Sequence, residues 1–417
     1  MTEPPRQRGL DAMRALVVVG LIFFHAALVF DTTDDYYVKN AQTADLGPVA
    51  AVGVVWAMPL LFLTAGLGVW YSLGRRTVGA FLVERARRLL VPLVFGVLVL
   101  MPLPVWLGLR SQPGYNESYL AFYPRFLHVR LVWSEFPFVV RGAPPDRLFE
   151  TGQLWFVVLL LAFSLLLLPA FLYLRGVGVG HLATLAERRG VILLPAVPIA
   201  VVVAALEMEE PYAAWSRWAY LLFFFLGFVL AADPRFLAAM RRHGPVAAGI
   251  GVVVFLGALG LLKASWDAGA DAFVDHDPRS MAGRFLFGAA GWLWLVAIVG
   301  LLARLPAQSA APRASRRARA GGYLSDAVLP IYVLHQPVLV AIAFAVVSWP
   351  VHPILKYLVI TLATLVAVVM AYDLLIRRTR VTRFLFGMRA PRPPVTPAGQ
   401  PPASPAEPSR TPVRRSA

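Results

Sequence analysis

The chain contains no cysteine and few charged residues. Without cysteine it forms no disulfide, has no thiolate nucleophile and holds no cysteine-ligated metal ion. Charged residues make up only 15% of the 417 residues and hydrophobic residues 59%, with a mean hydropathy of +0.67, far from a soluble domain. Acidic residues are the scarcer charged type, so the formal net charge is +16. Because the basic residues lie between apolar segments and form no stripe, the excess indicates membrane topology and no nucleic-acid partner.

Repeated apolar stretches of about 17–25 residues predict transmembrane helices. We mark ten such segments: 13–30, 48–73, 89–109, 153–174, 190–206, 216–232, 245–262, 283–305, 323–349 and 353–376. The first follows two arginines, as in a signal peptide, but more segments follow it, so we expect a retained helix. The sequence therefore predicts an all-α polytopic protein of the plasma or inner cell membrane, with about ten transmembrane helices.

Charge bias assigns the two ends of the segments to sides of the membrane. Arginines gather at the N-terminus, in the tail and in the connections after segments two, four, six and eight, for example Arg75, Arg76, Arg188, Arg189, Arg241, Arg242, Arg313 and Arg319. Acidic residues gather in the opposite loops, for example Asp31, Asp34, Asp45, Glu207, Glu210, Asp271 and Asp275. The positive-inside rule then places both termini in the cytoplasm.

Two stretches outside the segments differ from the rest. Residues 110–152 form the longest outside loop and mix aromatic with basic side chains. That composition suits a sugar-binding or lid role, and it suits an interfacial aromatic belt equally. Residues 390–417 are rich in proline, serine, alanine and arginine, which predicts a disordered cytoplasmic tail able to contact anionic lipid head groups. We therefore predict a transmembrane domain over residues 1–389 followed by this tail.

Arg14 and His25 lie eleven residues apart in the first segment. A helix turns about 100° and rises about 1.5 Å per residue, so they differ by about 20° in azimuth and about 16 Å along the axis. Asp11 falls within about 40° of His25 on the same face. With Arg14 near one surface, His25 lies at about mid-bilayer depth, where an ionisable residue indicates function. The alternative is a signal-anchor helix with a snorkelling arginine and a structurally bonded histidine.

Arg85 and Arg88 follow the second segment, three residues apart on one helix face at the cytosolic entry to the third. A pair of guanidinium groups is suited to clamping the phosphates of a nucleotide-bearing donor. The alternative is an ordinary topology signal, because most juxtamembrane arginine only sets orientation.

His335 lies about twelve residues into the ninth segment, also near mid-depth. Tyr332 and Gln336 flank it on nearby faces. Pro337 cannot donate to the carbonyl of Val333, and such irregular backbone is tolerated where it lines a cavity or is buried in protein. His335 is a candidate catalytic group, and a structural histidine bonded across helices is the alternative.

Trp155 stands at the outer entry to the fourth segment, in the run 153–156, which also suits an interfacial helix anchor. The other histidines lie in loops or at helix ends, and we assign them no role. They are His128, His181, His243, His276 and His352. We expect no metal site.

Taken together, these motifs resemble the membrane acyltransferase-3 family. The motifs follow in the family's order over about residues 9–389. They are the opening run 10–15 with 24–26, Arg85 and Arg88 before Pro92, the run 154–156 and the run 331–337. The runs 223–227 and 383–387 are most similar to the glucans biosynthesis protein C branch.

The resemblance implies ten helices and transfer of an acyl group, of the acetyl or succinyl class, from a cytosolic acyl-CoA-type donor. The acceptor it implies is a glycan or lipid-linked sugar, with no bound cofactor. By the same resemblance Arg14 and His25 are the essential pair, Arg85 and Arg88 belong to the donor side, and His335 matches a late histidine.

The chemistry of the residues agrees with that resemblance. His25 is able to take the proton of a sugar hydroxyl as a general base, and Arg14 to orient the donor or stabilise negative charge, while an acyl-imidazole intermediate stays open. The rival interpretation is a polytopic transporter or flippase for a glycan or lipid precursor. Proton-coupled transporters usually place carboxylates at mid-depth, and segments four to eight have none. A structural scaffold leaves the aligned Arg14 and His25 unexplained.

Overall fold

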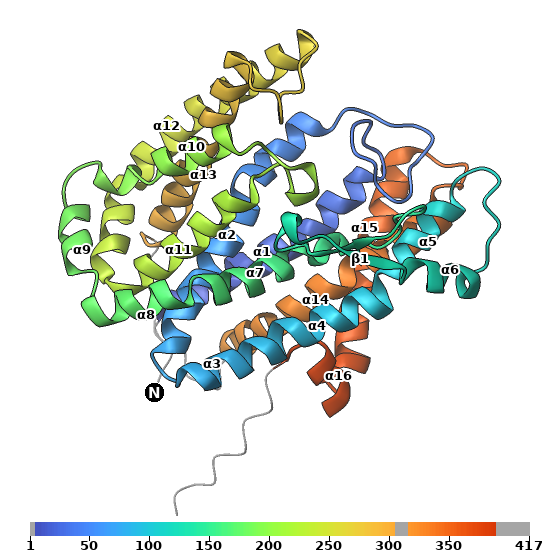
Figure 1. Ribbon diagram of the computed structural model, residues 1–417, viewed down its shortest axis with the longest axis horizontal. Helices are drawn as coiled ribbons and strands as arrows, with labels where there is room; N and C mark the ends of the chain where they lie inside the picture. The colour runs from blue at the N-terminus through green and yellow to red at the C-terminus, as the bar shows by residue number, and fades with distance from the viewer. Residues whose placement is uncertain (1–4, 305–315, 389–417) are drawn as a thin grey trace, which may run out of the picture.

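The computed structural model describes residues 5–304 and 316–388, with the side chains of residues 5–11, 316–321 and 325 left out. It is built of helices (Figure 1). The longer helices are α1 Pro5–Leu28, α2 Gly47–Leu73, α7 Trp155–Leu166, α8 Leu168–Val177, α10 Ala196–Ala205, α11 Arg217–Ala232, α12 Pro234–Asp267, α13 Pro278–Leu302, α14 Arg316–Val346 and α15 Pro353–Ala371. The shorter ones are α3 Val78–Arg85, α4 Val91–Phe95, α5 Pro102–Arg110, α6 Tyr119–Phe126, α9 Gly180–Ala186 and α16 Arg380–Leu385.

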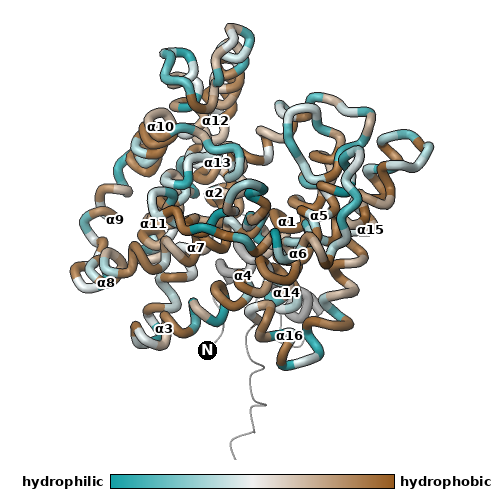
Figure 2. The backbone as a smooth tube through the Cα atoms, turned by 45° about the vertical axis from the view of Figure 1, so that its right-hand side comes forward, coloured by the Kyte–Doolittle hydropathy of each residue, from teal (hydrophilic) through white to brown (hydrophobic). Residues whose placement is uncertain are grey.

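Among the described residues, 7 helices are long and apolar enough to cross a membrane, or up to 9 if two bent pairs each count as one span. The apolar part of α1, Ala12–Leu28, is a shorter helix. Each of the ten predicted segments therefore coincides with a helix or a bent pair. Figure 2 shows hydrophobic helices joined by hydrophilic loops. The protein is an all-α, multi-pass membrane protein, as predicted. The boundary predicted between residues 389 and 390 and the tail after it lie outside the described residues.

Two predicted segments are not single straight helices. The fourth bends by 51° between α7 and α8, directly before Pro169. Proline removes a backbone donor and its ring clashes with the preceding turn, so the bend has a local cause. The fifth is a 3-10 turn, Val191–Leu193, followed by α10, and it meets α9 at 110°. Gly190 makes the corner with a φ of +80°, a conformation that suits glycine.

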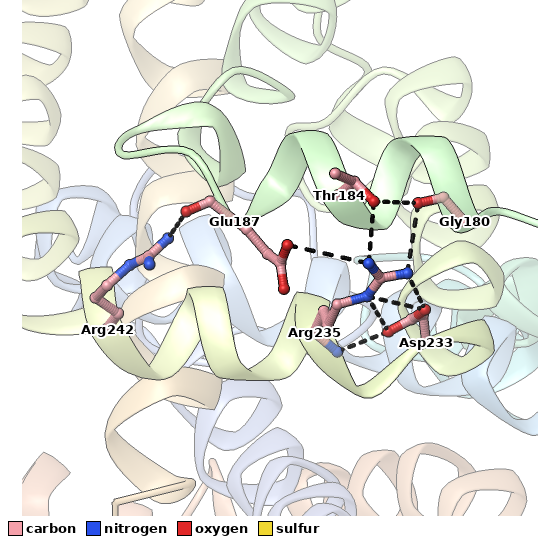
Figure 3. Close-up of polar contacts among 6 residues, drawn as sticks. All are labelled: Gly180, Thr184, Glu187, Asp233, Arg235 and Arg242. Carbon is pink, nitrogen blue, oxygen red and sulfur yellow. Dashed lines mark hydrogen bonds and ion pairs between the residues drawn. The ribbon is translucent and has the colours of Figure 1, made fainter.

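Polar contacts fasten α9 to the beginning of α12 (Figure 3). Arg235 donates to both carboxylate oxygens of Asp233, to the Thr184 hydroxyl at 3.0 Å and to the Gly180 carbonyl at 3.4 Å. Arg242 donates to the carbonyl of Glu187 at 2.5 Å. The bonds to Thr184, Gly180 and Glu187 cross between the two segments and fix the short helix α9 against α12.

The seventh segment is longer than predicted. Helix α12 begins at Pro234 and continues through Pro245, so Arg241 lies within a helix and not in a connection. Pro245 has no N–H for the carbonyl of Arg241, four residues earlier, and Arg304 Nε supplies a donor at 2.9 Å. His243, predicted to lie in a loop or at a helix end, is also inside α12 and accepts a bond from the Gly190 amide at 3.0 Å.

The long outside loop folds on itself. It contains α6 and a two-stranded antiparallel hairpin, β1 Val129–Leu131 and β2 Val140–Gly142, with Arg130 opposite Arg141. Arg125 pairs with Glu117 and Asp146, and Arg141 with Glu135. Two of its basic side chains are thus engaged in internal ion pairs.

Helix α1 packs against α2 on one side and against α14 and α15 on another, near the middle of the bundle (Figure 1). On its other side α2 crosses α11 closely through two glycines. A Cβ atom on Gly66 would lie 1.9 Å from the Phe224 carbonyl oxygen, and one on Gly227 would lie 1.9 Å from the Leu63 carbonyl oxygen. Glycine at both positions allows this backbone contact, which holds α2 beside α1.

We expect Gly227→Ala to destabilise the protein by about 1–3 kcal/mol, because its Cβ overlaps backbone that cannot move aside. Thermal unfolding of the purified protein in detergent should show a lower midpoint. Gly249→Ala in α12 is the matched control, since a Cβ there meets nothing within 4 Å. Equal unfolding midpoints for the two variants would contradict the close crossing.

Candidate functional site

His25 and His335 come from different helices and contact each other. His25 lies in the last turn of α1, and His335 lies near the middle of the Asp326–Val346 part of α14. His335 Nε2 is 3.2 Å from His25 Nδ1, with ring centroids 5.0 Å apart. His335 is fully buried, whereas His25 is partly exposed. Because the rings touch, His25 stands level with the middle of an apolar helix although α1 ends at Leu28.

The backbone around the two rings assigns their protons. His335 Nδ1 is 2.6 Å from the carbonyl of Tyr332, which only accepts, so Nδ1 carries the proton and the neutral ring has its lone pair on Nε2. His25 Nδ1 is 2.8 Å from the carbonyl of Leu21 and faces His335 Nε2, so it also carries a proton. The lone pair of neutral His25 is then on Nε2, for which the described residues provide no hydrogen-bond partner. This nitrogen has the geometry of an available base.

Helix α14 is joined to the start of α7 beside this pair. Pro337 leaves the Val333 carbonyl without its helical donor, and Gln153 Nε2 donates to it at 3.1 Å. In return, the hydroxyl of Tyr332 donates to the carbonyl of Gln153. Gln153 is buried and makes an interhelical contact.

Three side chains near the pair were not found by the sequence analysis. Tyr36 lies over His25 with a centroid distance of 6.1 Å, and the described part of the chain gives its buried hydroxyl no hydrogen-bond partner. Next to it, the Tyr37 hydroxyl donates to Glu150. Burial raises the pKa of the Glu150 carboxyl and of the Tyr37 phenol, which favours the neutral form of both. The adjacent tyrosines following the first segment were the only signal in the sequence.

Arg14 lies at the opposite part of α1, among other arginines. Its guanidinium donates to the backbone carbonyl of Thr64 in α2. Arg85 is close enough to Arg88 and Arg14 for their charges to repel its own. Glu84 is an anion within this group, 3.7 Å from Arg88. The structure thus gathers Arg14, Arg85 and Arg88, which the sequence placed on two different segments.

The helix holding Arg85 and Arg88 changes its winding between them. The α-helical turn ends at Arg85, and Ala86–Leu90 is a π-helix, followed by a second one at Gly96–Leu100. Such wide turns are rare and occur frequently at functional sites. No feature of the sequence predicted them.

The remaining predicted site residues have other surroundings. Trp155 stacks on Tyr220 with centroids 5.5 Å apart, in an aromatic cluster of the core. Gln336, next to His335 in α14, is buried, and its Oε1 has no hydrogen-bond partner among the described residues. The side chain of Asp11 lies outside the described residues.

The bundle of apolar helices, with ionisable side chains buried among them, defines a polytopic membrane protein with an internal polar site. A family model for an acyltransferase domain, Acyl_transf_3, matches residues 7–373. The chain therefore belongs to the acyltransferase-3 family and is an O-acyltransferase. A search of curated proteins and a search of solved structures find no match. The match spans all ten predicted segments almost completely, and nothing in it favours a transporter.

Proposed function

We propose that the protein moves an acyl group from a cytosolic acyl-CoA-type donor to a hydroxyl of an extracytoplasmic glycan or lipid-linked sugar. The observation that carries this proposal is the contact between His25 and His335, which leaves His25 Nε2 available in an apolar bundle. The acyl group is of the acetyl or succinyl class, and acyl-CoA acts as a co-substrate and not as a bound cofactor.

His25 acts as the general base in this proposal. Its Nε2 takes the proton of the acceptor hydroxyl while the hydroxyl oxygen attacks the thioester carbon. The thiolate leaves and recovers the proton from the imidazolium, so the ring ends neutral. His335 Nε2 faces the Nδ1–H of His25 and supports the imidazolium formed in between. Direct attack by His25, giving an acyl-imidazole, is the alternative path.

The arginine group is proposed to bind the donor. Arg14 lies about 16 Å from His25 along α1, so phosphates held at Arg14, Arg85 and Arg88 leave an extended thioester arm to reach the histidine. Mutual repulsion of these cations is relieved when a phosphate binds between them. Asp11, whose side chain lies outside the described residues, shares this part of α1 and stays a candidate.

We propose placement in the glucans biosynthesis protein C-like branch from the sequences of the runs 223–227 and 383–387. Gly387, with φ of +65°, lies against the Arg88 carbonyl and Pro92, so close that a Cβ would be 2.6 Å from that oxygen. Phe386 packs on Phe95 with centroids 5.3 Å apart. The run 383–387 therefore packs on the helix that carries the proposed donor arginines. Trp155, Tyr332 and Gln336 are proposed as structural or acceptor-side residues.

We further propose ten spans in the plasma or inner membrane with both termini in the cytoplasm, since arginine-rich and acid-rich connections alternate. Reporter fusions after Arg76, Arg189, Arg242 and Arg319 should report the cytoplasm. Those after Asp45, Glu210 and Asp275 should report the outside. An outside signal at Arg319 contradicts the ten-span topology.

His25→Gln should insert normally and lose acyl transfer by about 10²–10⁴-fold, because glutamine keeps polarity but is no useful base. The measurement is mass spectrometry of the cell's glycans, with the parent, the deletion and the variant, followed by transfer assays on purified protein. His276→Gln, in an exposed loop, is the control. A purified His25→Gln protein within a few fold of the parent removes His25 from the mechanism and makes His335 the leading candidate. An unchanged glycan profile in the deletion strain contradicts the proposed activity.

Arg85→Ala and Arg88→Ala should each weaken acyl-CoA binding while the protein stays folded, with only partial rescue by lysine, which lacks the bidentate fork. Binding of a labelled acyl-CoA to purified protein measures this. Arg87→Ala is the matched control, since Arg87 lies between the two and is exposed. Unchanged donor affinity in the double variant reduces both arginines to topology signals.

A further inference from the structure

A cavity of about 440 Å³ lies where the connection from α14 to α15 meets the loop after α1. Asn40 and Gln42 line it from the loop, and Trp349, His352 and Lys356 line it from the connection and α15. Its size falls within the range of small-molecule sites. In the proposed topology it opens to the outside.

Lys356 is buried in this cavity's wall, with 8% of its surface exposed. Its ammonium donates to Asn40 Oδ1 at 2.9 Å and to the Val347 carbonyl at 2.7 Å. Both acceptors are neutral, and an ammonium has three N–H groups, so one donor remains. No ion pair among the described residues includes Lys356. A lysine this deeply buried normally has a charged partner.

The ends of the two neighbouring helices act on this charge in opposite directions. Lys356 is in the first turns of α15, which begins at Pro353, and a helical side chain points back toward the N-terminus, the positive end of the dipole. The Val347 carbonyl, just after α14, belongs to a negative helix end and offsets this unfavourable position. The α15 amides of Ile354 and Leu355 are already bonded to His352, and Lys356 is among the residues that line the cavity.

Arg284 shows what a structural buried cation looks like in this protein. It is fully buried in α13 and donates to the carbonyl of Ala204, in the last turn of α10, at 3.2 Å. Its charge stabilises a helix C-terminus, and the cavity residues do not include it. Lys356 also donates to a carbonyl at a helix end, and it differs from Arg284 because it lines a cavity.

Helix α15, which contributes Lys356 to the cavity, also contacts the helix that carries His25. Tyr357, the residue after Lys356, donates from its hydroxyl to the Phe23 carbonyl in α1 at 3.4 Å, two residues before His25. The Tyr357 ring also packs on Phe30, with centroids 6.3 Å apart. A molecule held at Lys356 therefore binds next to the helix that carries the proposed base.

We propose that this cavity binds an anionic group of the acceptor, a phosphate or a carboxylate, with Lys356 as its counter-ion and Trp349 against the attached sugar. The identity of the acceptor in this inference rests on the proposed function. The negative charge of the acceptor is inferred from Lys356 and the cavity. The acceptor class it names is an acidic glycan or a phosphate-linked sugar, and Lys356 contributes to acceptor affinity and not to the bond-forming step.

The test uses the full chain in phosphatidylcholine nanodiscs, titrated separately with inorganic phosphate and with glucuronate. We expect saturable thermal stabilisation and a change in tryptophan fluorescence. Lys356→Gln should raise the dissociation constant on the order of 10- to 100-fold, as for loss of a charge-assisted hydrogen bond. Lys356→Arg should retain binding. Lys263→Gln, at an exposed lysine paired with Asp267, should bind like the parent.

Trp349→Phe locates the site independently of Lys356. This variant should keep the thermal stabilisation and lose the fluorescence change, because Trp349 lines the cavity. If Lys356→Gln does not fold, the comparison of Trp349→Phe with the parent tests the proposal by itself. A fluorescence change in Trp349→Phe equal to that of the parent overturns the proposal. Equal anion affinity in Lys356→Gln and the parent also overturns it.

The different ligands distinguish the possible sources of the anion. The binding and transfer measurements together distinguish this inference from the proposed function. Stabilisation by glucuronate but not phosphate identifies an acidic sugar, and the reverse identifies a phosphate-linked acceptor. Stabilisation only on adding phosphatidylglycerol to the nanodisc identifies a lipid head group and contradicts an acceptor site. Acyl transfer to a neutral sugar without anion binding contradicts this inference alone. Anion binding without any acyl transfer contradicts the proposed function and leaves the anion site.

Discussion

Backbone carbonyls that lose their helical donor need another donor inside an apolar bundle, and this requirement organises the centre of the protein. Where proline interrupts a helix, the carbonyl four residues earlier is left without its N–H. At Pro337 the donor is Gln153, 3.1 Å from the Val333 carbonyl, and at Pro245 it is Arg304, 2.9 Å from the Arg241 carbonyl. In both cases the replacement donor comes from another helix or from its border, so an interruption within one helix becomes a bond between two.

The bond at Pro337 has a consequence for the histidines. Gln153 donates to the Val333 carbonyl and accepts from the Tyr332 hydroxyl, and these two bonds fix the rotation of α14 against the start of α7. The Tyr332 carbonyl in turn holds Nδ1 of His335, and this sets which nitrogen of His335 faces His25. A connected set of hydrogen bonds thus links Pro337 to the tautomer of His335, the ring that contacts His25 in α1. The tertiary contacts orient the imidazoles before any substrate is present.

The sequence predicted relations within a helix better than relations between helices. The spacing of Arg14 and His25 depends only on helical geometry, and the loss of a donor at Val333 follows from Pro337 alone. Two contacts of His25, with His335 and with Tyr36, depend on which segments are neighbours in the fold. Periodicity shows which face of a helix a residue lies on, but it does not show which helix packs against that face. The family resemblance predicted that His25 and His335 matter, without a geometry. Bends and π-turns were missed because they arise from packing and from single prolines within otherwise uniform apolar runs, as at Pro169.

Charge is distributed in the fold according to the cost of burying it. Two cations bond to acceptors with full or partial negative charge, Arg235 to Asp233 and Arg284 to a carbonyl at the end of α10. Two other places bring positive charge together or bury it. The cluster of Arg14, Arg85 and Arg88 gathers like charges, with Glu84 3.7 Å from Arg88 among the described side chains, and Lys356 is a buried lysine in the wall of a cavity. Bringing like charges together or burying a charge costs folding free energy, and an anion bound there would offset part of that cost. One place lies at the Arg14 end of α1 and the other beside its His25 end, which is the arrangement that the proposed function requires for an anionic donor and an acceptor bound on opposite sides of the membrane.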